Sequence, residues 1–189
     1  MKYLGKILLG TALALLGAQA HAIAISPTNC DTTFPPDPTL PDRACYVGST
    51  TAQPDVPSIV GNTDLNEVYK AESNPFAEEG GFAGNYNTVF SNTSTDPEDA
   101  TISYTGGNSI DCPECWLLVK DGNATPTWYI FDISDWDGTD PIVLTDFWVG
   151  NGAISNVAIY SNPAPGPLVV MAIGLIGMIT LRRAAMKAS

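Results

Sequence analysis

The sequence predicts an all-β protein, a single β-sandwich or jelly-roll-like domain flanked by two apolar terminal segments. Three observations lead to this prediction. The middle of the chain consists of short runs rich in β-branched and aromatic residues, separated by clusters of Gly, Asn, Asp and Pro. Long apolar runs of helical character occur only at the two ends. The roughly 140 residues between these ends are enough for one domain with its own core.

Residues 1–22 have the three parts of a secretory signal peptide. A short positive start is followed by the apolar run 7–16 and by small residues that offer cleavage after Ala20 or Ala22. We expect signal peptidase to cut after Ala22, with Ala20 nearly as suitable. Because His21 is the single histidine, the mature body has no histidine beyond its first residue. This excludes Ser-His-Asp catalysis and His-ligated zinc.

Residues 23–65 precede the predicted sandwich, and we call this segment the lead-in. We expect it to be extended and held in place by disulfides. Prolines interrupt this segment repeatedly and leave little room for regular structure.

Residues 66–162 form the predicted sandwich core. The better strand candidates are 101–105, 116–120, 127–133, 142–149 and 153–160. In the last of these, Val157 and Ile159 alternate with small or polar neighbours, which predicts a half-buried strand. The Asp-Gly sequences within 120–123 and 135–140 predict hairpin turns.

Residues 163–189 combine a proline-rich start, an apolar run and a basic tail. The run 168–181 has 14 residues, about 21 Å as a helix at ~1.5 Å per residue. It would therefore cross a hydrocarbon core of ~30 Å only marginally, as a short transmembrane helix. Arg182 and Arg183 place the tail in the cytoplasm, so the body lies across the inner membrane. A permanent anchor is the alternative to a processed segment.

This three-part layout resembles the PEP-CTERM protein-sorting signal. That signal is recognised by exosortase-type membrane proteases in Gram-negative bacteria that make exopolysaccharide. The usual Pro-Glu-Pro is here Pro163-Ala164-Pro165, and Gly166 stands where Ser or Thr is common. The resemblance implies a sorting helix that an exosortase-like protease removes.

A second resemblance covers roughly residues 116–160. The Trp-Tyr-Ile-Phe-Asp run at 128–132, the turn at 136–139 and the Ile-Ser-Asn-Val strand at 154–157 are similar to the closing strands of many exported PEP-CTERM proteins. Asp137 stands where that turn often has Asn. The resemblance implies a β-sandwich exported to the envelope or matrix, and it brings no catalytic site.

The charges are unevenly distributed. The chain has 8 Lys and Arg against 20 Asp and Glu, a formal net charge of −12. Five of the cations lie in the two terminal segments, so the body keeps 3 cations against 20 carboxylates, a net charge of −17. Nucleic acid as a partner, and docking on an anionic membrane through a basic patch, are therefore excluded.

The body has four cysteines, an even number that predicts disulfides in an exported chain. Their spacing suggests Cys30–Cys45 and Cys112–Cys115, and two other pairings remain open. A redox-active Cys-Pro-Glu-Cys and a zinc site of four thiolates are the alternatives. The first is disfavoured because redox motifs open a helix, whereas the strand-like run 116–119 follows here.

The turn at 135–140 offers two kinds of binding residue. Asp135, Asp137 and Asp140 supply hard oxygens on a tight loop, which is part of what calcium requires. A plain turn explains the same residues. Trp136 is the tryptophan that we expect to be exposed, and it is the candidate for stacking on a glycan.

We therefore expect a non-enzymatic exported surface or exopolysaccharide and biofilm-matrix protein, sorted by an exosortase-like system. The expected partners are signal peptidase, an exosortase-like protease and extracellular polysaccharide, with the membrane bound through the C-terminal helix until processing. No cofactor is expected, with calcium as the one candidate. A carbohydrate-binding module is the alternative function, followed by a carboxylate-based glycoside hydrolase.

Overall fold

A computed structural model of the chain describes residues 22–32, 43–93 and 95–162. All of the predicted signal peptide except Ala22 lies outside these ranges, as does the predicted sorting segment with Pro163, Ala164, Pro165, Gly166, Arg182 and Arg183. Within the described ranges, no helix has the length and apolar character needed to cross a membrane. The elements are β1 (Ile23–Ile25), η1 (Pro27–Asn29), β2 (Cys30–Asp31), β3 (Arg43–Gly48), α1 (Val56–Val60), β4 (Asn66–Ser73), β5 (Phe76–Glu79), β6 (Tyr86–Ser91), β7 (Asp99–Tyr104), β8 (Cys115–Lys120), β9 (Trp128–Asp132), β10 (Ile142–Leu144) and β11 (Asn156–Ser161).

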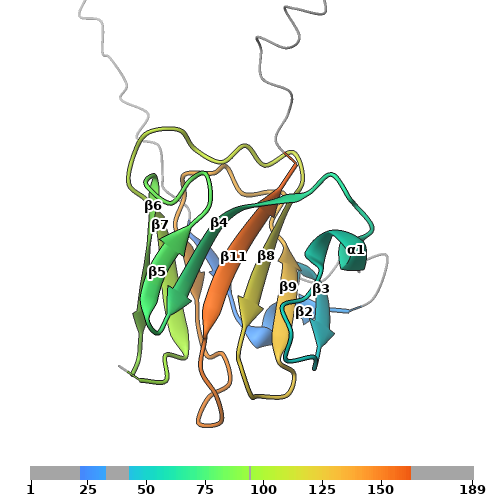
Figure 1. The fold of residues 1–189 in the computed structure, drawn as a ribbon, viewed down its shortest axis with the longest axis vertical. Coiled ribbons are helices and arrows are strands. Elements are labelled where there is room, and N and C mark those ends of the chain that lie inside the picture. The colour runs from blue at the N-terminus through green and yellow to red at the C-terminus, as the bar shows by residue number, and fades with distance from the viewer. Residues whose placement is uncertain (1–21, 33–42, 94, 163–189) are drawn as a thin grey trace, which may run out of the picture.

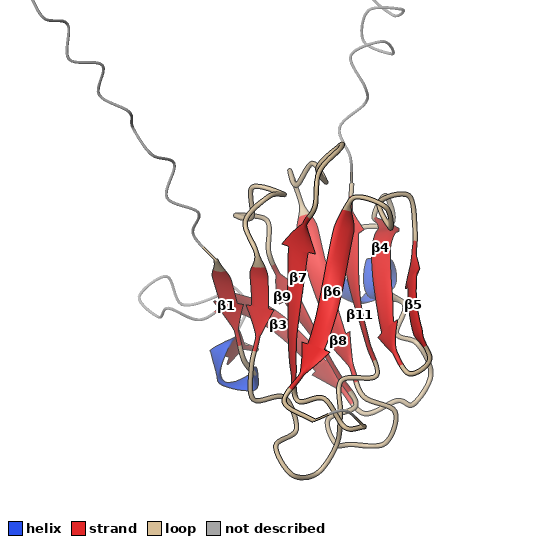
Figure 2. Cartoon of the chain, turned by 90° about the vertical axis from the view of Figure 1, so that its left-hand side faces the viewer, coloured by secondary structure: helices blue, strands red, loops and turns tan. Residues whose placement is uncertain are grey.

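The described fold is mostly β and has two sheets. The four-stranded sheet has the order β1-β10-β7-β6, and the seven-stranded sheet has the order β2-β3-β9-β8-β11-β4-β5. Figures 1 and 2 show the two sheets stacked face to face. Ile102 and Ile142 of the first sheet share one buried cluster with Leu117, Phe131 and Val157 of the second. This cluster is the main core. The all-β class is confirmed, while the jelly-roll-like winding stays a prediction.

A second, smaller cluster lies on the outer face of the seven-stranded sheet. Trp116 and Leu118 of β8 and Ala158 and Tyr160 of β11 pack there against Val56 of α1. Figure 1 shows α1 on the β3 and β9 side of this sheet. The seven-stranded sheet therefore has buried side chains on both faces.

The prediction that the last strand is half-buried is wrong, because all six residues of β11 are buried. Val157 and Ile159 belong to the main core, and Ala158 and Tyr160 to the outer cluster. The alternation of side chains between the two faces is as predicted. The outer face of β11 is covered by α1 and the chain around it. The residue pattern within the strand does not predict this covering.

The lead-in contains regular structure, contrary to the prediction. Its strand β1 pairs in parallel with β10, and its strand β3 pairs antiparallel with β9. Among the described prolines of the lead-in, Pro27 lies in η1 and Pro57 in α1, and Pro54 precedes α1, so they fall outside its strands. Strands β4, β5 and β6 were also not predicted, since they have more polar residues than the runs that follow.

The predicted turn at 120–123 is confirmed, whereas the predicted hairpin at 135–140 and the predicted strand 142–149 need correction. The turn 120–123 joins the antiparallel pair β8 and β9, as a hairpin should. The turn 135–140 leads instead from β9 in one sheet to β10 in the other, so it is not a hairpin. The strand predicted over 142–149 ends at Leu144. Asp146 and Trp148 have φ values of 60° and 53°, a left-handed conformation that a strand cannot continue.

Candidate functional site

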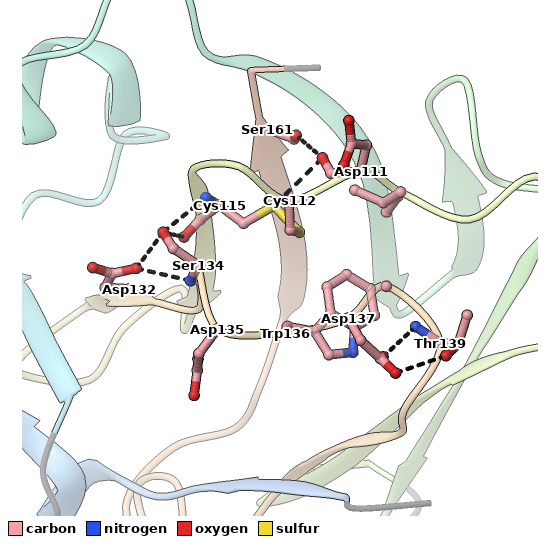
Figure 3. The surroundings of a disulfide bond; sticks show 12 residues. Asp111, Cys112, Cys115, Asp132, Ser134, Asp135, Trp136, Asp137, Thr139 and Ser161 are labelled. Carbon is pink, nitrogen blue, oxygen red and sulfur yellow. Dashed lines mark hydrogen bonds between the residues drawn. A yellow bond between two sulfur atoms is a disulfide. The ribbon is translucent and has the colours of Figure 1, made fainter. Parts of the chain in front are cut away.

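The two disulfides have the pairing that the spacing suggests. Cys30 is bonded to Cys45 and Cys112 to Cys115, and the part of the chain that the structure describes has no free cysteine. Cys115 is fully buried at the start of β8. Nearby, the Ser161 hydroxyl donates to the Asp111 carbonyl at 2.6 Å, so the loop before β8 is held against the end of β11 (Figure 3). This bridge lies at a strand end and not at the helix N-terminus typical of redox-active pairs.

Of the three aspartates proposed as calcium ligands, Asp135 and Asp137 lie near that disulfide (Figure 3) and have other partners, and Asp140 donates its backbone N–H to Asp137. Asp135 forms an ion pair with Arg43, with 3.0 Å between Nη2 and Oδ2. Asp137 accepts the backbone N–H groups of Thr139 and Asp140, each at 2.8 Å. Figure 3 shows the side chains of Asp135 and Asp137 pointing in different directions. Across the described ranges, no three His, Cys, Asp or Glu side chains gather into a group that could hold a metal.

Hydrogen bonds also set the electrostatics of this turn. The hydrogen bond from Arg43 is the main reason why the pKa of Asp135 lies below its usual value. The N–H of Asp140, followed by that of Thr139, lowers the pKa of Asp137. Both carboxylates are thus stabilised in their ionised form by groups of the protein itself.

Trp136 is buried, and the prediction that it is the exposed tryptophan is wrong. Its side chain is 3% exposed, its ring centroid lies 5.8 Å from that of Tyr86, and Nε1 donates to the Asp140 carbonyl at 2.7 Å. The turn passes from one sheet to the other, and this carries the ring into the main core. Trp116 and Trp128 are each 7% exposed. None of these three rings presents a face to a glycan.

A polar groove lies at the opposite end of the sandwich. It has a volume of about 510 Å³. It is lined by Ser73 at the end of β4 and Asn74 after it, residues 95–96 between β6 and β7, residues 121–125 between β8 and β9, and residues 151–153 and Ser155 before β11. In Figure 1 these connections are at the lower end, where β4 and β8 finish and β11 begins. Ligand pockets commonly measure about 300–1,000 Å³, so the groove is large enough for a small ligand or part of a polymer.

Asp121 joins two of these loops. One of its oxygens, Oδ1, accepts the N–H groups of Asn123 and Ala124 at 2.5 and 3.3 Å, and Oδ2 accepts that of Ala153 at 2.6 Å. The residue is 4% exposed. Gly152 allows the close approach, because a Cβ there would lie 2.3 Å from Oδ2. Asp121 therefore holds the hairpin turn against the segment before β11.

Backbone hydrogen bonds stabilise the floor of the groove. Ser73 N donates to the Ser155 carbonyl at 2.9 Å, Ser155 N to the Lys120 carbonyl at 2.8 Å, and Ile154 N to the Pro97 carbonyl at 2.7 Å. These bonds connect β4, β8 and the loop between β6 and β7 through one segment. The floor of the groove is thus held by both sheets.

The rim of the groove is polar. Asn74, Thr95, Asn123, Thr125 and Asn151 line it and are exposed. Their amides and hydroxyls both donate and accept hydrogen bonds, and within the described residues they make no side-chain hydrogen bond to the protein. Neither Lys, Arg nor His is among the lining residues.

A smaller hollow of about 200 Å³ continues the groove past Ser73, Asn74 and Thr95, which line both. Its walls include Phe76 at the start of β5 and Phe90 of β6. The two rings meet edge to face, with centroids 6.5 Å apart. Phe76 is 57% exposed. An exposed aromatic ring thus lies beside a polar groove.

Sequence reasoning found one part of this site and missed the rest. The Asp121-Gly122-Asn123 turn was identified as a hairpin, which is its local structure. That it meets Asn74, Thr95 and Asn151 depends on pairings between distant strands. The available signal was the number of Asn, Thr and Ser residues in loops, which is common to turns in general.

Comparison of the chain with protein-family models, with curated proteins and with solved structures gives no match.

Proposed function

We propose that this chain is a non-enzymatic exported protein of the cell envelope or of an exopolysaccharide or biofilm matrix. Signal peptidase removes its N-terminal segment. The C-terminal apolar helix then anchors it in the inner membrane until an exosortase-like protease cuts there and releases it to the envelope or the exterior.

The observation that carries this proposal is the three-part C-terminal layout. Pro163-Ala164-Pro165 precedes the apolar run 168–181, and Arg182 and Arg183 follow directly. A buried helix of a globular domain rarely combines a proline-rich start, an apolar surface all round and a terminal Arg pair. Together with a signal peptide, the layout is typical of a protein that passes through the membrane and is then processed.

The limits of the described fold support the same proposal. The central strand β11 ends at Ser161, just before the proline motif, so a cut within residues 163–189 would leave β11 whole. At the other end β1 begins at Ile23, directly after the expected cleavage site. Ile23 N donates to the Pro141 carbonyl at 2.8 Å, and a new ammonium group there would keep this bond.

The experiment is mass spectrometry of the mature termini after expression of the full chain in a host with an exosortase. We expect the N-terminus at Ile23 and a C-terminus that lies before Leu168. The double variant Arg182→Ala/Arg183→Ala should keep residues 168–189 and remain in the membrane fraction, because the basic end of the signal is gone. Val149→Ala, an exposed change in the body, serves as the matched control and should be processed normally.

An envelope protein that retains Leu168–Ser189 in this host would show a permanent anchor and overturn the sorting proposal. A chain that begins at His21 would move only the signal-peptidase site.

A carbohydrate-binding module is the second candidate, and the groove with its exposed Phe76 favours it. A glycoside hydrolase would need two carboxylates that act on the bond to be cut. The carboxylates that line the groove are Asp96 and Asp121. Both oxygens of Asp121 already accept backbone N–H groups, which supports binding rather than hydrolysis.

A further inference from the structure

We infer that the groove between residues 73–74, 95–96, 121–125 and 151–155, extended by the ring of Phe76, binds a segment of a neutral polysaccharide. This inference rests on the second candidate function and names its site and ligand class. It does not depend on the sorting proposal.

The polar rim matches the hydroxyl groups of a sugar. The amides of Asn74, Asn123 and Asn151 and the hydroxyls of Thr95 and Thr125 surround the groove. Each amide offers two donors and an acceptor, and each hydroxyl offers a donor and acceptors. A sugar hydroxyl also donates and accepts, so pairs of neighbouring hydroxyls can be bound by such groups. These side chains face water in the free protein, and binding does not require breaking hydrogen bonds within the described fold.

The exposed ring of Phe76 matches the apolar face of a sugar ring. A pyranose has C–H groups on its faces, and it gains from covering an apolar surface. Phe76 is 57% exposed although its residue type is usually buried. The ring of Phe90 lies edge to face with that of Phe76, with the centroids 6.5 Å apart. The ring and the polar groove share Asn74 and Ser73 as neighbours.

The charges select a neutral ligand. The groove has Asp96 and Asp121 among its lining residues and no cationic side chain. It belongs to a body with 3 cations against 20 carboxylates. Phosphate, sulfate and uronate groups would meet repulsion and no positive partner. A polymer of neutral hexoses meets neither difficulty.

The geometry also suits a polymer rather than a free monosaccharide. Hollows of about 510 and 200 Å³ follow one another along the end of the sandwich. The floor is preorganised by Asp121 and by the Ile154–Pro97 hydrogen bond, so little ordering is needed on binding.

The test is isothermal titration calorimetry on the exported protein, with maltohexaose, cellohexaose, laminarihexaose and dextran as neutral probes and alginate as the acidic one. We expect at least one neutral probe to bind and alginate not to bind. Phe76→Ala should weaken that binding about tenfold or more, because an apolar contact of ring size is lost. Asn151→Ala should weaken it several-fold. Val47→Ala, which removes an exposed apolar side chain outside the groove, should leave it unchanged.

Thermal unfolding of each variant checks that the fold is kept, which we expect because Phe76 and Asn151 are both exposed. Neutral-glycan binding that persists in Phe76→Ala and Asn151→Ala would keep the second candidate function but overturn this site. Equal binding of alginate would overturn the choice of a neutral ligand but keep the second candidate function. Absence of binding to every probe would overturn both. The mature termini are measured separately, so failure here leaves the sorting proposal unaffected.

Discussion

At the residue scale, the groove depends most on Asp121. Its two carboxylate oxygens accept N–H groups from Asn123, Ala124 and Ala153. A buried carboxylate is costly unless it is hydrogen-bonded, and here the bonds come from two loops that are far apart in sequence. One side chain therefore stabilises the fold and shapes the candidate site.

We predict that Asp121→Ala lowers the free energy of unfolding by about 3 kcal/mol. Three N–H groups lose a charged acceptor, at about 1.5–3 kcal/mol for each such bond, and water restores part of the loss. Urea unfolding at pH 7 measures the change. The matched control is Asp96→Ala, an exposed aspartate of the same groove, which should change stability by less than ~0.5 kcal/mol. Equal small effects of both substitutions would contradict the role given to Asp121.

The ion pair between Arg43 and Asp135 predicts a dependence of stability on pH. The pKa of Asp135 is lowered in the folded protein, so the pair stabilises the fold above the unfolded pKa of about 4 and loses this effect as the pH falls further. Asp135→Asn should cost under ~1 kcal/mol at pH 7, because this carboxylate is largely exposed, and less at pH 3. Urea unfolding at both pH values tests this.

Asp64→Asn is the control for the pH experiment. Asp64 is exposed, and its side chain makes no hydrogen bond or ion pair among the described residues. The control should behave like the wild-type protein at both pH values. If Asp135→Asn costs the same at pH 3 as at pH 7, the ion pair is not the source of the pH dependence.

At the scale of elements, β8 and β11 are the strands on which the sandwich is centred. They are adjacent in the seven-stranded sheet, and all residues of both are buried. Strands covered on both faces have near-continuous apolar runs. Trp116–Lys120 shows such a run in the sequence, and so it was predicted within one residue of its observed limits.

The disulfide between Cys30 and Cys45 links β2 to β3, two lead-in strands at one edge of the seven-stranded sheet. It closes a separation of 15 residues, whereas Cys112 and Cys115 are 3 apart. On the chain-entropy model the longer loop is worth about 3 kcal/mol and the shorter about 1.5 kcal/mol. We predict that replacing Cys30 and Cys45 by alanine costs about twice as much unfolding free energy as replacing the other pair. Urea unfolding of the two double variants measures the ratio, and a larger loss for the Cys112/Cys115 pair would refute this ranking.

At the scale of the whole molecule, the two ends of the sandwich differ. One end has the Cys112–Cys115 disulfide, the turn with Asp135 and Asp137, and the last residue of β11 (Figure 3). The other end has the groove, formed by loops from both sheets. A C-terminal attachment and a ligand could therefore act at the same time without competing for space.

The candidate site was less predictable than the fold. Asp-rich turns and a turn tryptophan attract attention in a sequence, yet Asp137 bonds to its own turn and Trp136 is in the core. Phe76 lay in a stretch that was not predicted to be a strand, and its exposure follows from its place on the edge strand β5. The residue types near Phe76 cannot show that no other part of the protein covers its side chain.

The sequence by itself determined the β class, the runs that became β7, β8, β9 and β11, the turn at 120–123, and a histidine-free body with a net charge of −17. These properties depend on composition and on patterns within about ten residues. The tertiary structure decided that β11 is buried on both faces, that the turn at 135–140 crosses between sheets, and that four distant loops enclose one groove. Burial and site geometry depend on long-range strand pairing, because a side chain's surroundings come from residues far away in the chain.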